Sequence, residues 1–66
     1  MGKIVVAEMI IEFRLKNKLT QGEFGDLLGV TAQAISKWER EVCYPDITIL
    51  PDLAQVLGCT VNDFFE

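Results

Sequence analysis

Residues 20–41 read TQGEFGDLLGVTAQAISKWERE, and the rest of the chain is organised around them. Thr20 and Glu23 have the spacing of a capping box, in which each side chain satisfies a free backbone N–H group at a helix start. The apolar residues that follow are spaced three and four positions apart and so share one helix face: Phe24, Leu27 and Leu28. The pattern predicts a helix over residues 21–28.

A second short helix is predicted over residues 32–40. Gly29 ends the first helix, because glycine takes a left-handed backbone at no steric cost. Thr31 can cap the helix that follows. Gly25 is small enough to let the second helix cross close over the first. Two short helices joined by a glycine turn are the parts of a helix-turn-helix unit, here about residues 20–40.

A longer helix is predicted before this unit, over residues 4–17. One stripe of apolar residues recurs at helical spacing: Val6, Ile10 and Phe13. A second apolar set is displaced around the same helix: Ile4, Ile11 and Leu15. A surface helix needs only one stripe. The second set therefore either widens the core or forms a contact patch for a second subunit or an attached domain.

A fourth helix is predicted over residues 47–57, with Asp46 as its candidate cap. Pro51 lies inside this range, so we expect an irregular turn at 47–50 and regular helix from about the proline, which is tolerated at a first helical position. The apolar face of this helix consists of Leu50, Leu53, Ala54 and Leu57.

The last residues contain a glycine that can end the fourth helix and a second capping pattern. Gly58 ends the fourth helix, and Thr60 with Asp63 starts a short fifth helix. A chain of 66 residues makes one domain at most and buries only a small core. The prediction is a single all-α domain over residues 1–66.

The charged residues are unevenly distributed along the chain. The formal net charge is −4, but all six basic residues lie within the first 40 positions, against five acids there. The five acids beyond position 40 have no basic residue among them. One face of the domain can therefore meet a phosphate backbone while the other repels it.

The composition excludes several classes of function. The chain has no His and only two cysteines, Cys43 and Cys59, so neither a nucleophile–base pair nor a zinc ligand set is evident. We therefore expect no enzyme, no metal site and no cofactor. No signal-peptide pattern and no apolar run of about 18 residues is present, so a cytoplasmic location is expected.

Four pieces of the chain, in this order and at this spacing, resemble the Cro/repressor family of helix-turn-helix domains, also called the lambda-repressor-like fold. They are Leu19-Thr20-Gln21, Leu28-Gly29-Val30-Thr31, Ile35-Ser36-Lys37-Trp38-Glu39-Arg40 and Tyr44-Pro45-Asp46. The resemblance extends from Arg14 to the last residues. It implies a compact five-helix lambda-repressor-like domain that binds double-stranded DNA sequence-specifically as a transcriptional regulator.

The resemblance also implies roles for individual residues, with helix 32–40 as the recognition helix in the major groove. Bases would be read by Gln33, Lys37, Ala32 and Ser36. DNA phosphates would be contacted by Gln21, Thr31 and Arg40. Structural roles fall to Arg14, Glu39, Trp38 and Ile35, with an ion pair between Arg14 and Glu39 tying the first helix to the third. Gln33 can offer a bidentate amide to adenine, and Lys37 can donate to guanine.

In two turns the chain departs from the family pattern. Family members often have glycine where this chain has Lys18, and Asn17 is expected to take the left-handed geometry instead. They usually have glycine after Arg40, where this chain has Glu41. Without that glycine, helix 32–40 is expected to run on by a residue or two.

A two-fold dimer on a pseudo-palindromic site is expected, because one small module contacts too few base pairs for useful specificity. The second apolar set, Ile4, Ile11 and Leu15, is the predicted interface. The alternative is a protein-interaction module or antitoxin-like adaptor on the same fold, with weak DNA binding, that would use Ile11, Leu15 and the acidic half of the chain.

Overall fold

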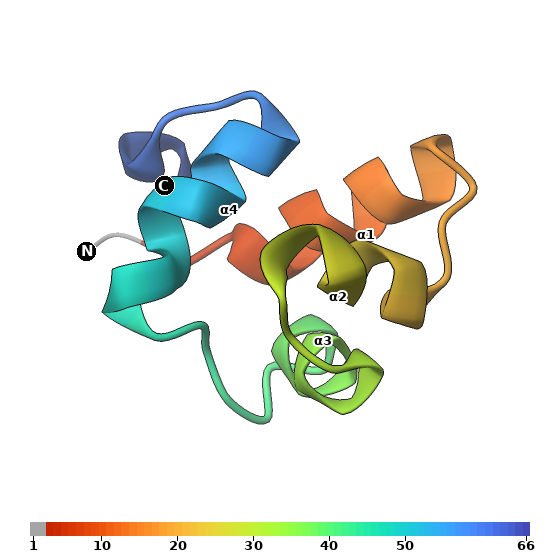
Figure 1. Cartoon of the computed structure of the whole chain (residues 1–66). Coiled ribbons are helices and arrows are strands. Elements are labelled where there is room, and N and C mark those ends of the chain that lie inside the picture. Colours follow the sequence, from red (N-terminus) through yellow and green to blue (C-terminus); the bar gives the residue numbers. More distant parts are fainter. Residues whose placement is uncertain (1–2) are drawn as a thin grey trace.

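Local capping decides where the two helices of the helix-turn-helix unit begin. In the computed structural model, which describes residues 3–66, α2 spans Gln21–Leu28 and α3 spans Ala32–Glu39 (Figure 1). The Thr20 hydroxyl accepts a hydrogen bond from the Glu23 N–H (3.0 Å), and the Glu23 carboxylate accepts one from the Thr20 N–H (2.8 Å). This reciprocal pair confirms the capping box and satisfies two of the donors that a helix start leaves free.

The other elements pack around this unit. α1 spans Val6–Lys16, and a 3₁₀ turn at Ile47–Ile49 leads into α4, which spans Leu50–Leu57. A last 3₁₀ turn covers Val61–Phe64. The irregular entry to the fourth helix is confirmed, as is its end at Gly58, which has a φ of 75°. Figure 1 shows α1 running between α4 on one side and the α2–α3 pair on the other.

The prediction of a short fifth helix, and with it of a five-helix domain, is wrong, since residues 3–66 contain four α-helices and Val61–Phe64 forms only a 3₁₀ turn. The Thr60 N–H does donate to the Asp63 carboxylate (3.0 Å), but this capping organises a single turn. Phe65 then takes an extended backbone, with φ −120° and ψ 121°, and pairs with Ile4 in an antiparallel bridge. Because the Phe65 backbone pairs with Ile4, it is not available to continue a helix beyond Phe64.

The same pairing explains why α1 begins at Val6 rather than at residue 4. The Val5 N–H donates to the Phe64 carbonyl (2.9 Å) and Ile4 pairs with Phe65, so both residues are held by the end of the chain rather than in the helix. Apolar periodicity predicts which face of a helix is buried, but it carries no information about a backbone partner far along the chain.

The turn after α1 places the left-handed residue one position later than predicted. Lys18 has a φ of 56°, whereas Asn17 has a φ of −96°. The Asn17 side chain is engaged elsewhere, because its Nδ2 donates to the Phe13 carbonyl (2.8 Å). The Leu19 N–H donates to the Arg14 carbonyl (2.9 Å), which closes the turn and requires the positive φ at the residue before it.

The turn after α3 also differs from the prediction, because α3 does not run on. It ends at Glu39, with Arg40 as its cap residue, and Glu41 takes a φ of 60° despite its side chain. The Val42 N–H donates to the Lys37 carbonyl (3.0 Å). This bond satisfies a carbonyl that the helix end leaves free and offsets the cost of the left-handed residue.

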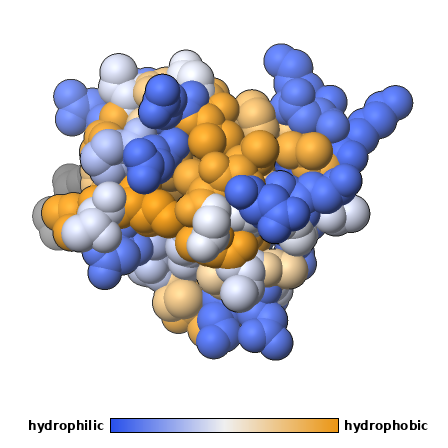
Figure 2. Space-filling view, viewed as in Figure 1, coloured by the Kyte–Doolittle hydropathy of each residue, from blue (hydrophilic) through white to orange (hydrophobic). Residues whose placement is uncertain are grey.

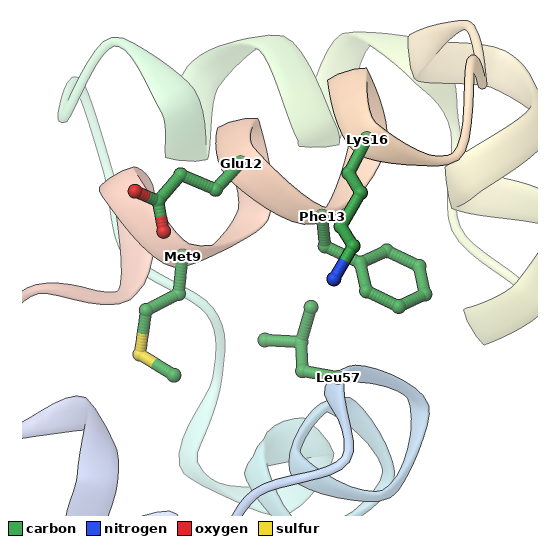
Figure 3. A pocket seen from close by; sticks show the side chains of 5 residues that line it. All are labelled: Met9, Glu12, Phe13, Lys16 and Leu57. Atoms are coloured by element: carbon green, nitrogen blue, oxygen red, sulfur yellow. The ribbon is translucent and has the colours of Figure 1, made fainter.

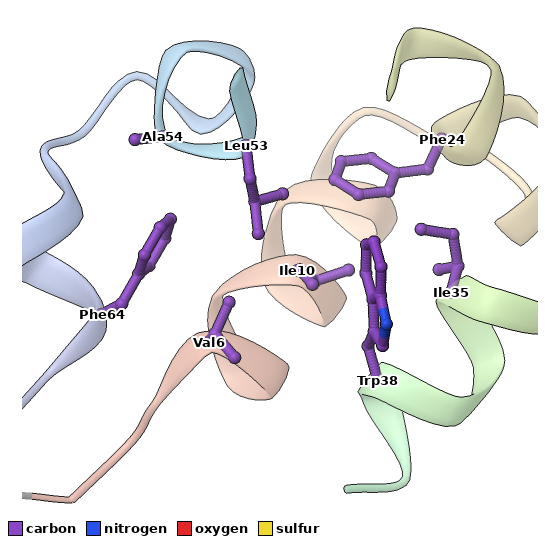
Figure 4. Packing of buried hydrophobic residues seen from close by; sticks show 8 residues of the cluster. All are labelled: Val6, Ile10, Phe24, Ile35, Trp38, Leu53, Ala54 and Phe64. Atoms are coloured by element: carbon purple, nitrogen blue, oxygen red, sulfur yellow. The ribbon is translucent and has the colours of Figure 1, made fainter. Parts of the chain in front are cut away.

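The core lies where all four α-helices meet (Figure 4). Its main buried cluster consists of Val6, Ile10, Phe24, Ile35, Trp38, Leu53, Ala54 and Phe64. Phe13 packs its ring edge-to-face on Phe24, with ring centroids 5.8 Å apart. The stripe Val6, Ile10 and Phe13 thus faces the core, as predicted, although Phe13 is only half-buried.

Leu27 does not share the buried face of α2, contrary to the prediction, and is 54% exposed. Phe24 and Gly25 are buried, and Leu28 is half-buried. At about 100° per residue these three positions centre the inner face between Phe24 and Gly25, and Leu27 lies roughly a right angle away from it.

Gly25 lies where α2 meets the turn into α3. A Cβ atom at this position would lie 2.5 Å from the Val30 carbonyl oxygen and 3.3 Å from backbone atoms of Thr31. The main chain of a tight turn cannot move aside as a flexible side chain can. The absence of a side chain at Gly25 therefore allows the turn at Val30 and Thr31, just ahead of α3, to approach α2 closely, whereas the sequence analysis expected the second helix itself to cross there.

Gly25→Ala is expected to lower the free energy of unfolding by about 1–3 kcal/mol, the usual cost of overpacking. The measurement is urea denaturation followed by circular dichroism. Gly22→Ala is the matched control in the same helix, because its Cβ would meet only ordinary contacts, the nearest at 3.8 Å. Alanine is the better helix former, so this control is expected to be neutral or stabilising. Equal stability of the two variants would contradict the close approach.

Candidate nucleic-acid interface

α3 has one buried face and one exposed face. Ile35 and Trp38 are 0% and 6% exposed and anchor the helix in the core. Gln33 and Lys37 are exposed and lie four positions apart, so they share the opposite face. This agrees with the arrangement predicted from the sequence, in which Gln33 and Lys37 lie on the side of the helix opposite Trp38. Two polar side chains of the kind that read base edges therefore project from a helix whose other face is held rigidly.

The first turn of α3 is capped from within. Thr31 is exposed, and its hydroxyl accepts from the Ala34 N–H (3.1 Å). The hydroxyl proton stays available for an external acceptor such as a phosphate oxygen. Ala32 is exposed next to it and offers only a methyl group. An alanine at this position can touch a thymine methyl but makes no hydrogen bond.

Ser36 and Arg40 interact with each other at the other end of α3. The Arg40 Nε donates to the Ser36 hydroxyl oxygen (3.1 Å). Arg40 is exposed and Ser36 is half-buried. This bond occupies one of the five guanidinium N–H donors and leaves the others free. Of the two, Arg40 is thus better placed to meet a ligand.

Gln21 is the first residue of α2, and its side chain reaches the last residue of α3. Its Nε2 donates to Glu39 Oε1 over 3.0 Å. The two helix starts also lie close together, since a Cβ built on Gly22 would lie 3.8 Å from the Ala32 Cβ. Backbone N–H groups at a helix start attract anions. The start of α2 and the exposed first turn of α3 therefore form one continuous surface.

Arg14 and Glu39 join α1 to α3 by a bidentate ion pair. The Arg14 Nε lies 2.7 Å from Glu39 Oε2, and its Nη2 lies 3.0 Å from Glu39 Oε1. The two side chains are 17% and 6% exposed. Burial alone would raise the pKa of the Glu39 carboxyl, but hydrogen bonds from Arg14 and Gln21 outweigh it and lower that pKa. The hydrogen bond to Glu39 likewise raises the pKa of Arg14.

The structure thus brings Arg14, Gln21 and Glu39 into one hydrogen-bonded network. The hydrogen bond between Gln21 and Glu39 was not predicted from the sequence. The ion pair was expected from the resemblance, and Gln21 was expected to face DNA. Nothing local signals that Gln21 would also contact Glu39, because 18 positions separate them.

A groove of about 210 Å³ lies apart from α3, between α1 and α4 (Figure 3). It is lined by Met9, Glu12, Phe13, Lys16 and Leu57. Figure 2 shows apolar side chains across the centre of the same view as Figure 1, with hydrophilic groups around them.

Within residues 3–66, no group of three or more Cys, Asp or Glu side chains is placed to hold a metal ion. None of the helices described is long and apolar enough to cross a membrane.

A sequence-family model described as helix-turn-helix matches residues 10–64. The P22 c2 repressor protein, solved in complex with the synthetic operator 9T, is 34% identical to this chain. Its structure matches with a TM-score of 0.80 over 89% of each chain. A search of curated protein sequences found no match.

Two other solved structures share the fold. A transcriptional regulator from Listeria innocua has a TM-score of 0.79 at 20% identity, over 89% of this chain and 55% of that one. Hydroxypropylphosphonic acid epoxidase from S. wedmorenis has a TM-score of 0.74 at 25% identity, over all of this chain but only 35% of its own. The family model covers most of the chain and the repressor match is strong at both levels, so the chain belongs to the helix-turn-helix family, of the Cro/repressor type.

Proposed function

We propose that this domain binds double-stranded DNA sequence-specifically as a transcriptional regulator, with α3 in the major groove. The observation that carries the proposal is the exposed polar face of α3 with Gln33 and Lys37, opposite the buried Ile35 and Trp38. The major groove of B-DNA is wide enough for a helix presented in this way. The similar P22 c2 repressor protein, which was solved with a synthetic operator, supports DNA as the partner.

Base identity is read chiefly by Gln33 and Lys37 in this proposal. The Gln33 amide pairs with the N6 and N7 edge of adenine, and the Lys37 ammonium donates to the O6 and N7 acceptors of guanine. Ala32 contributes a methyl contact. Ser36 retains a hydroxyl proton to donate, although its oxygen already accepts from Arg40.

Phosphate contacts flank these readers and set the register of the domain on the duplex. Arg40 supplies guanidinium donors at the end of α3, and Thr31 supplies a hydroxyl at its start. Gln21 supplies an amide at the start of α2, where the backbone N–H groups add positive partial charge.

The domain acts as a two-fold dimer in this proposal, because one module reads few base pairs. The exposure of apolar side chains in the predicted dimer interface, which consists of Ile4, Ile11 and Leu15, supports this surface as a contact between two copies. Leu15 is 62% exposed and Ile4 is 40% exposed, whereas Ile11 is half-buried. Ile4 lies at the chain-end bridge with Phe65, so Leu15 is the member of the set best placed for a partner. The family match and the repressor relative favour DNA binding over the protein-interaction alternative.

Gln33→Ala is expected to weaken binding to the preferred site by roughly 1–3 kcal/mol and to relax preference at one base pair per half-site, because a bidentate amide contributes that much discrimination. The site is first selected from a random duplex pool. Binding is then measured on this site and on scrambled DNA. An equal loss on both DNAs would show that Gln33 is not a reader.

Gln21→Ala and Lys37→Ala provide the comparison for that experiment. Gln21→Ala is expected to weaken all sequences about equally, since a phosphate contact carries no base identity. Lys37→Ala is expected to lose more affinity on the preferred site than on scrambled DNA, because the Lys37 ammonium reads guanine in this proposal. A slope of log affinity against log salt that falls by about 0.9 in this variant would show instead that Lys37 contacts the DNA backbone. If the wild-type chain shows no salt-dependent binding to duplex DNA, the proposed function is wrong.

A further inference from the structure

The first residue of α2 is held by the last residue of α3. Gln21 Nε2 donates to Glu39 Oε1 over 3.0 Å. Neither side chain is free on the surface, because Gln21 is half-buried and the Glu39 side chain is only 6% exposed. An expected DNA contact therefore also has a partner inside the domain.

This bond sets the orientation of the Gln21 amide. A carboxylate only accepts hydrogen bonds, so the NH₂ end of the amide must point to Glu39 and the carbonyl oxygen must point away from it. One of the two N–H donors is used. The second N–H and the carbonyl oxygen remain for a ligand at the start of α2.

Glu39 is in turn fixed from the other side by Arg14. The bidentate pair occupies both carboxylate oxygens, and Arg14 Nη1 also donates to the Leu19 carbonyl (3.2 Å), just ahead of the α2 cap. The positive guanidinium balances the carboxylate, so Glu39 can orient an amide near DNA without placing an unpaired negative charge there.

We propose that Glu39 is a positioning residue that orients Gln21 for a phosphate of bound duplex DNA. The proposal rests on the proposed function, since it needs DNA as the ligand. A long side chain that is already ordered loses little rotamer freedom when it binds, and ordering one such side chain in advance raises affinity by roughly two- to tenfold.

The first test measures the mobility of the free protein. The Gln21 side-chain amide is expected to show restricted motion by ¹⁵N relaxation, whereas the exposed amides of Gln33 and Gln55 serve as mobile references. Equal mobility of the Gln21 and Gln33 amides overturns the proposal. This measurement needs no substitution at Glu39 and so holds even if a Glu39 variant fails to fold.

The second test is a double-substitution cycle on the selected duplex, with Glu39→Gln, Gln21→Ala and the pair. Glu39→Gln is expected to lower affinity roughly two- to tenfold in the wild-type background and to have no further effect when Gln21 is alanine. Glu41→Gln is the matched control, since it removes an exposed carboxylate two positions away. Loss of that charge alone is expected to raise affinity slightly.

Two outcomes of the cycle overturn the proposal. One is an equal loss from Glu39→Gln in both backgrounds, which would make Glu39 merely structural. The other is wild-type affinity in Gln21→Ala, which would leave nothing to position. Both can occur while the wild-type chain binds DNA, so they differ from failure of the proposed function, in which the wild-type chain shows no salt-dependent binding.

Discussion

Arg14→Ala is expected to lower the free energy of unfolding by about 3–5 kcal/mol, because the Glu39 carboxylate, whose side chain is only 6% exposed, loses its ionic partner. Lys16→Ala, on the same helix, removes an exposed positive charge and is expected to cost only about 0–1 kcal/mol. Urea denaturation of both variants, followed by circular dichroism at low temperature, measures the difference. Equal denaturation midpoints would show that the Arg14–Glu39 pair does not hold α1 against α3 in solution.

The pH dependence of stability gives an independent check on this pair. The pKa of Glu39 is lowered in the folded state, so its stabilising contribution is present above the pKa of the unfolded chain, about 4.3, and is lost as the pH falls through the folded value. In Arg14→Ala the hydrogen bonds from Arg14 that lower the pKa of Glu39 are gone, and only the bond from Gln21 still opposes the effect of burial. The stability difference between wild type and variant is therefore expected to shrink in acid.

Trp38→Ala is also expected to lower the free energy of unfolding by about 3–5 kcal/mol, the usual cost of removing a large aromatic side chain from a core. Trp38 is 6% exposed and packs in the cluster that joins all four α-helices. It is the chain's only tryptophan, so unfolding of the variant has to be followed by circular dichroism rather than fluorescence.

The control for this stability prediction is the neighbouring Lys37→Ala, which truncates an exposed side chain on the same helix and is expected to change the free energy of unfolding little.

Trp38→Phe keeps an aromatic ring in the core and is expected to retain the affinity for the selected DNA site. A Trp38→Ala variant with wild-type stability but greatly reduced DNA affinity would contradict the core role and would indicate a stacking contact with bases.

The start of α2 and the ends of α2 and α4 followed directly from the sequence. The capping box of Thr20 and Glu23 and the left-handed glycines Gly29 and Gly58 act over three to five residues, so the residues that decide them are visible together. The same holds for the exposed face of α3, since helical periodicity alone separates Gln33 and Lys37 from Ile35 and Trp38.

The predictions for the last helix and for the turn after α1 failed because another hydrogen-bonding interaction outweighed the local backbone preference. The final capping pattern makes only a 3₁₀ turn, because Phe65 pairs with Ile4 at the opposite end of the chain. Lys18 takes the left-handed turn because the Asn17 side chain bonds back to α1.

By itself, then, the sequence determined the helix-turn-helix unit and the side of α3 that meets solvent, since both depend on neighbours within one or two turns. Only the tertiary structure decided how the start of α2 is tied to the end of α3. Gln21, Glu39 and Arg14 come together because α1 and α2 both pack against α3. Contacts of this kind depend on how whole helices cross, and side-chain spacing along a single helix carries no record of that geometry.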